Sequence, residues 1–184
     1  MAEATAADSE GTEITPTEAL PPLSPSEFRA FNRIAEHMDL YHNHFRHTWN
    51  QLYTVASEGR RPAGVSLRAY INTGLEFCTH LEMHHSIEER HVFPQFAERM
   101  PTFRKELELL TQHKQIHAGL DQFQHYLKEC TNGEQDLRMD ELKRLMDGFG
   151  GVLWQHLDDE VKQLGAENMR KYWTLEEMKR IPFG

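Results

Sequence analysis

The sequence predicts an all-α fold: an up-down-up-down four-helix bundle with a disordered N-terminal tail and a short C-terminal helix. Apolar residues recur every three or four positions through four long segments, as they do on the buried face of a helix. Short stretches with glycine, proline or polar residues join these segments, and short connections make consecutive helices antiparallel neighbours. No segment has the alternation of polar and apolar residues that is typical of a strand.

The first helix is expected over about residues 25–57. Ser24 can cap this helix, Pro25 suits its first position, and Glu27 completes a capping box. Gly59 lies just past the expected end, where glycine is typical.

The other long helices are expected over about residues 66–99, 102–130 and 137–164. Pro94 lies inside the second of them and removes a backbone donor, so we expect either a kink there or an earlier end of the helix. Thr174 and Glu177 form a second capping box, which predicts a short last helix from Thr174.

The chain of 184 residues is long enough for one domain with a sizeable core. Residues 1–23 are rich in Ala, Thr, Glu and Pro, have no apolar period, and are expected to be a disordered tail. Residues 24–165 are expected to form the bundle, and residues 166–184 a C-terminal extension.

Charge and hydropathy exclude several classes of partner. The net charge of -9 argues against nucleic acid or an anionic membrane surface as the main partner. No apolar run reaches the ~18 residues that a transmembrane helix needs. The N-terminus lacks the features of a secretion signal, and Cys78 and Cys130 form no closely spaced motif, so we expect a cytoplasmic protein.

Each apolar stripe is interrupted once by side chains of the kinds that bind metals. The interrupting residues are, in chain order, His42, His85, Glu89, His113, His117, His156 and Glu160. Burying such groups without partners costs several kcal/mol. We therefore expect them to satisfy one another through a shared cation.

The spacing of these residues also suits metal binding. Three of the helices carry pairs at i and i+4, which place two donor atoms on one face. Counted from the connecting turns, all the positions fall within a few helical turns of one level. Because the chain has 12 histidines, a single pair with this spacing can occur by chance. The prediction rests instead on the presence of one ligand group on each helix.

The second helix offers an alternative pair, His84 and Glu88. We prefer His85 and Glu89, because their face also contains Leu81 and Phe96. The remaining histidines are interpreted as solvated or rim positions: His37, His44, His47, His80, His84, His91 and His125.

At these residues the chain resembles the hemerythrin family and its HHE cation-binding relatives. The matching segments are MDLYHNHF around His42, HHSIEERHVFP from His84 to Pro94, HKQIH from His113 to His117 and HLDDE from His156 to Glu160. The resemblance covers about residues 30–165. It implies a four-helix bundle with a non-haem di-iron centre.

The resemblance also implies a distribution of ligands. One iron would take His113, His117 and His156, the other His42 and His85, with Glu89 and Glu160 bridging them. Mn or Zn could replace the two Fe ions, because imidazole and carboxylate ligands suit all three metals. Oxygen carriers of the family place an aspartate five residues after the last histidine, whereas His156 here is followed by Glu160 four residues later.

Several functions are compatible with such a site. The first is binding or sensing of O2 or a related small ligand, which five imidazoles and only two carboxylates favour. The second is an O2-activating oxygenase or oxidase with an organic substrate. The third is an iron-responsive interaction module, and the fourth a metal-free bundle with a polar core. No catalytic residue is assigned.

Overall fold

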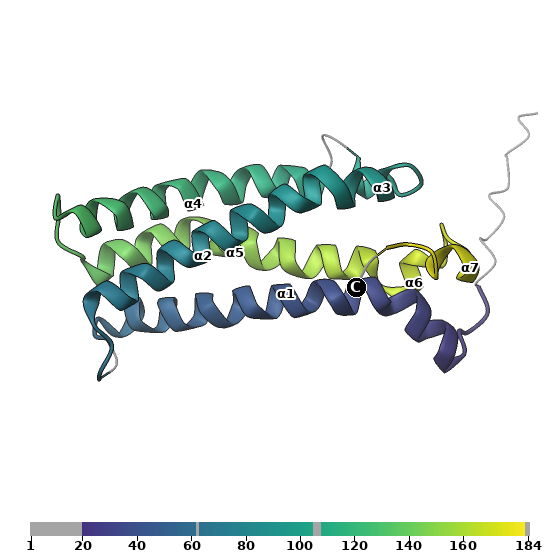
Figure 1. Ribbon diagram of the computed structural model, residues 1–184, viewed down its shortest axis with the longest axis horizontal. Coiled ribbons are helices and arrows are strands. Elements are labelled where there is room, and N and C mark those ends of the chain that lie inside the picture. Colours follow the sequence, from purple (N-terminus) through teal and green to yellow (C-terminus); the bar gives the residue numbers. More distant parts are fainter. Residues whose placement is uncertain (1–19, 62, 105–107, 183–184) are drawn as a thin grey trace, which may run out of the picture.

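The computed structural model describes residues 20–61, 63–104 and 108–182, and within these ranges every regular element is a helix (Figure 1). The four long helices are α1 (Pro25–Glu58), α2 (Leu67–Ile87), α4 (Glu108–Asn132) and α5 (Met139–Leu164). They lie side by side as a bundle in which α1 contacts α2 and α5, and α4 contacts the same two helices. The all-helical prediction is confirmed.

The ends of α1 form as the sequence predicts. Ser24 and Glu27 make the expected capping box. Gly59 closes the helix in the left-handed conformation, with φ 70°, which a residue without Cβ adopts at no steric cost.

The second predicted helix changes type along its length. After α2 the chain forms a π-helix, η1 (Glu88–Val92), and then a short helix, α3 (Phe93–Ala97). In η1 the Phe93 N–H reaches back five residues to the Glu88 carbonyl. Pro94 follows at once, and because it has no N–H it could not continue a regular α-helical ladder. The chain therefore stays helical past Pro94, with one extra residue in the turn before it.

The third predicted helix does not begin at Thr102. Residues Pro101–Phe103 form a 3₁₀ turn, η2, and Arg104 is extended. The helix described here is α4, from Glu108, and residues 105–107 lie outside the described part of the chain.

The C-terminal segment packs against the bundle. It forms α6 (Ala166–Met169), which the sequence did not predict, and α7 (Leu175–Met178), whose capping box from Thr174 and Glu177 confirms the prediction. Both short helices contact α1 (Figure 1). Most of the predicted tail lies outside the described residues, but Leu23 packs against the core.

The core consists of two apolar clusters at different heights in the bundle. One surrounds Trp49, Phe123 and Phe149, and two glycines allow its helices to approach closely. A Cβ on Gly119 would lie 2.5 Å from the Cβ of Phe149, and one on Gly150 would lie 2.7 Å from Cζ2 of Trp49. The other cluster surrounds Phe31 and Phe96 and includes the C-terminal segment. A buried polar layer separates the two.

Candidate metal centre

The polar layer contains fully buried residues from α1, α2, η1, α4 and α5. Its completely enclosed members are His42, His85, Glu88, Gln112, His113, His156 and Glu160. Apolar residues of the two clusters lie on either side of it along α1, α4, α5 and the α2–η1–α3 segment, as the interrupted stripes of the sequence predict. Water is therefore kept from the layer by the same side chains that stabilise the bundle.

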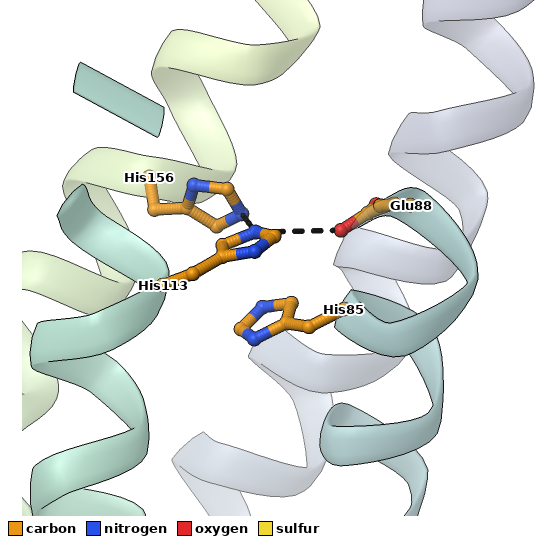
Figure 2. A group of neighbouring side chains, drawn as sticks. All are labelled: His85, Glu88, His113 and His156. Atoms are coloured by element: carbon orange, nitrogen blue, oxygen red, sulfur yellow. Dashed lines mark hydrogen bonds and ion pairs between the residues drawn. The ribbon is translucent and has the colours of Figure 1, made fainter. Parts of the chain in front are cut away.

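Within this layer, two groups of side chains have the composition and spacing of a cation site. The first is His85, Glu88, His113 and His156 (Figure 2), and the second is His42, His84, Glu88 and Glu160. In each group, one ligand atom from every member lies within 4.8 Å of the others. Glu88 belongs to both groups, so the two positions are adjacent and share a carboxylate.

The imidazoles of the layer are held by their outer nitrogens. Nδ1 of His42 lies 3.0 Å from the Leu157 carbonyl oxygen, and Nδ1 of His156 lies 3.2 Å from Oε1 of Gln112. Both oxygens can only accept, so each Nδ1 carries the proton and donates. This arrangement is typical of metal-binding histidines, in which an outer hydrogen bond fixes the ring and leaves Nε2 as the ligand atom.

His113 follows the same pattern through a carboxylate. Its Nδ1 donates to Oε1 of Glu89 at 2.9 Å, and Figure 2 shows the ring facing His156 and Glu88. Nε2 of His113 lies 3.1 Å from Nε2 of His156 and 3.5 Å from Oε2 of Glu88. Since each Nδ1 is already a donor, two nitrogen lone pairs face each other in the neutral state.

Protonation of His113 or His156 would relieve this repulsion, but burial disfavours the charged form of both rings. Burial lowers the pKa of His113, and it lowers the pKa of His156 to about 3. Both rings are consequently neutral near pH 7, and neutral imidazole is the form that binds metals. A cation between the nitrogens removes the conflict, so the residues present fit a metal ion.

The two buried carboxyl groups lead to the same conclusion. The oxygens of Glu88 and Glu160 are enclosed, and imidazole nitrogens lie next to them. Nε2 of His84 lies 2.8 Å from Oε1 of Glu88, and Nε2 of His42 and Nε2 of His156 each lie 3.5 Å from Oε2 of Glu160. Burial and the nearby Glu160 raise the pKa of Glu88 well above its usual value. Burial also opposes ionisation of Glu160, but the hydrogen-bonding and charge interactions with His42 and His156 outweigh it and lower its pKa. Two enclosed carboxyls whose neighbours are imidazole nitrogens are satisfied by a divalent cation that the two kinds of ligand share.

The structure brings most of the sequence-predicted residues together. His42, His85, His113, His156 and Glu160 are all members of the two groups. The remaining predicted ligands, Glu89 and His117, lie outside both groups.

Glu89 and His117 occupy outer positions. The Glu89 side chain is 42% exposed and contacts His113 from outside. Nε2 of His117, which is half-buried, lies 3.2 Å from Nδ1 of His85. At this level of α4 the buried positions are Gln112, His113 and Ile116, which leaves His117 at the edge of the buried stripe.

Glu88 and His84 are members of the two groups that the preferred prediction did not include, although the alternative pair contained both. The preference for His85 and Glu89 rested on Leu81 and Phe96, both interpreted as lying on the same face of one continuous α-helix. The π turn of η1 adds a residue before Phe96 and shifts it by about 100° relative to an α-helix. Counting helical positions back from Phe96 as if the segment were one α-helix therefore places Glu89 on the buried face. The residue that is buried is Glu88.

Comparisons with known proteins agree with this geometry. A family model described as "Hemerythrin HHE cation binding domain" matches residues 33–166. A protein of Cryptosporiopsis sp. (strain 8999), named "Dimeric xanthone biosynthesis cluster protein R11", is 26% identical over 151 residues, which are 77% of this chain. The chain spans about half of that relative, 55% of its length. No solved structure matches.

Proposed function

Because this chain belongs to the hemerythrin HHE cation-binding domain family, we propose that it holds two iron ions in the polar layer and binds or senses O2 or a related small ligand. The proposal includes an up-down-up-down topology, in which consecutive long helices run in opposite directions. The observation that supports it most is the convergence of lone pairs from His113 and His156, each ring being held by its outer nitrogen.

The proposed ligands follow the two groups of side chains. One ion would be held by His85, His113 and His156, and the other by His42, His84 and Glu160, with Glu88 shared between them. Imidazole and carboxylate without thiolate suit iron, and also manganese or zinc. Iron so held supplies redox chemistry and a position for a small ligand when the coordination shell is left incomplete.

Hydrogen bonds within the protein hold the proposed ligands of this layer in place. His42, His113 and His156 are fixed by hydrogen bonds to Leu157, Glu89 and Gln112, so little reorganisation is needed for binding. The enclosing apolar clusters exclude bulk water. The excess of imidazole over carboxylate gives a less anionic site than that of the carboxylate-rich di-iron proteins, which favours binding over oxidation of a substrate.

Metal content and visible spectra of the purified protein test the proposal. We expect about two iron ions per chain and a colour in air that is lost reversibly when O2 is removed. Protein purified from iron-supplemented cells that contains no iron, manganese or zinc would contradict it.

A second candidate is an O2-dependent di-iron oxidoreductase with an organic substrate. It is favoured by the name of the similar protein of Cryptosporiopsis sp., which refers to a biosynthesis cluster for a dimeric xanthone. The two candidates differ in a simple measurement. A binding protein takes up O2 once per site, whereas an oxidoreductase consumes O2 continuously when its substrate is added.

A further inference from the structure

A cavity of about 720 Å³ lies between α1 and the α2–η1 segment, immediately beside the polar layer. His84 and Glu88 line it, and both also belong to the second cation group. The His84 ring lies 5.3 Å from the His42 ring on one side and 5.1 Å from Phe45 on the other, measured between centroids. His84 is thus the boundary between the cavity and the layer.

The walls of the cavity are mainly apolar and aromatic. Phe45 and Met38 form buried parts of the wall. Nearer the surface, Tyr41, Met83 and Ile87 are 51%, 56% and 49% exposed, although all three are large apolar or aromatic side chains. Aromatic rings and methionine sulfur make favourable contacts with a flat aromatic molecule. A volume of this size is in the range of small-molecule sites.

The polar groups of the cavity select among such molecules. Besides His84 and Glu88, the polar residues of its described lining are His37, His44, His80, His91 and Gln95, and the described lining contains no lysine or arginine. A carboxylate or phosphate would therefore find only imidazole and amide groups to replace the water that it loses on entry. A neutral hydroxyl fits better, because it can donate to or accept from an imidazole of the lining and carries no full charge to desolvate.

We propose that this cavity binds an uncharged, hydroxylated aromatic molecule, with the ring between α1 and α2 and the hydroxyl at the imidazoles that line the cavity. This proposal depends on the proposed metal site only where His84 and Glu88 meet the cavity. The apolar walls exist independently of it, so the binding of an aromatic ligand and the binding of metal can be tested separately.

Calorimetric titration of the purified full-length protein with 2-naphthol tests the proposal, with iron content measured on the same sample. We expect one molecule bound per chain, and binding of 2-naphthoate, which has the same ring system with an anionic group, weaker by about tenfold or more. Met83→Glu should weaken 2-naphthol binding by about tenfold, because it places a charge in the apolar wall. Leu67→Glu is the matched control, since Leu67 is an exposed leucine of the same helix outside the cavity.

The outcomes separate the two proposals. Binding of 2-naphthol that Met83→Glu weakens and Leu67→Glu does not, in protein without metal, supports the cavity and contradicts the metal site. Iron-loaded protein that binds no 2-naphthol, or binds it equally well in both variants, overturns the cavity proposal. A monomer–dimer shift caused by Met83→Glu, with no effect on 2-naphthol, would make this face an interface between copies and also overturn it.

Discussion

The imidazole ring of His85 stacks on the ring of His113, with centroids 3.9 Å apart and planes inclined by 14°. The contact joins α2 to α4 inside the polar layer, and Nδ1 of His85 is in turn next to His117. His85 therefore follows the pattern of the other buried imidazoles: its outer nitrogen has a partner, and its Nε2 has none among the described residues.

His85→Ala should reduce the metal content of the purified protein, because it removes a nitrogen donor from the first cation group. His117→Ala should have a smaller effect, since His117 acts on His85 from outside and loss of such a partner weakens metal affinity by about 10- to 100-fold. Metal per chain, measured by elemental analysis, checks both. His125→Ala is the control, as this side chain on α4 is exposed; equal metal loss in all three variants would contradict the assignment.

Glu88 and Glu89 are neighbours with different expected roles. Glu88→Gln should abolish loading of at least one ion, because it removes the carboxylate that both groups share. Glu89→Gln should retain the metal, because an amide oxygen can still accept the proton of His113 Nδ1. Metal analysis with thermal unfolding before and after chelation distinguishes the pair. If Glu89→Gln lost the metal and Glu88→Gln kept it, the π-helical register would be the wrong basis for the site.

Glycines on α5 provide a test of close packing. Gly150→Ala should destabilise the protein by about 1–3 kcal/mol, because its Cβ would overlap the Trp49 ring. Gly151→Ala is the matched control: apart from the neighbouring residues and the nearby backbone of its own helix, no atom lies within 4 Å of an added Cβ, and removing a helical glycine should stabilise by up to about 1 kcal/mol. Urea unfolding of the two variants measures the difference. Equal effects would mean that the helices do not approach here as described.

Glu177 predicts a pH dependence of stability. Its hydrogen bond to Arg99, with those to Thr174, lowers its pKa from 4.5 to about 2. A depressed pKa in the folded state stabilises above the unfolded value, and this contribution is lost as pH falls from about 4.5 towards about 2. Glu177→Gln should therefore lower the Tm at pH 7, and its difference from the wild type should shrink through that range.

The control for this prediction is Glu176→Gln on the same short helix. Glu176 contacts Lys179 and takes no part in the capping box, so its substitution should change the Tm less at pH 7. Because Glu177 lies at the surface, its effect should also weaken at high salt. A difference for Glu177→Gln that stayed constant from pH 7 down to pH 2 would exclude the ionised carboxylate as its cause.

The helices were predictable where local signals are strong. Ser24 with Glu27, Gly59, and Thr174 with Glu177 mark ends through hydrogen bonds and backbone conformations that depend only on near neighbours. Helix α6 lacked such a signal, because it is stabilised by burial of Ala166 and Met169 against distant residues.

The candidate site was predictable where one helical phase holds along a segment. His42, His113, His156 and Glu160 lie on α1, α4 and α5, which keep α-helical geometry through the layer. The choice between neighbours on the second helix depended on a hydrogen-bonding change at η1, which apolar periodicity does not record. The outer roles of Glu89 and His117 depend on contacts between helices, which no single helix encodes.

The extra residue in η1 also constrains how this chain can vary in length. Deleting one residue between Glu88 and Val92 would convert the π turn to an ordinary α turn and would leave Phe93 and Phe96 facing their cluster, because the π turn contains the one residue that an α turn lacks. The shared carboxylate precedes this turn and the aromatic residues follow it. Homologues that lack this residue should therefore form an ordinary α turn here, and alignments of this region should place their gap here.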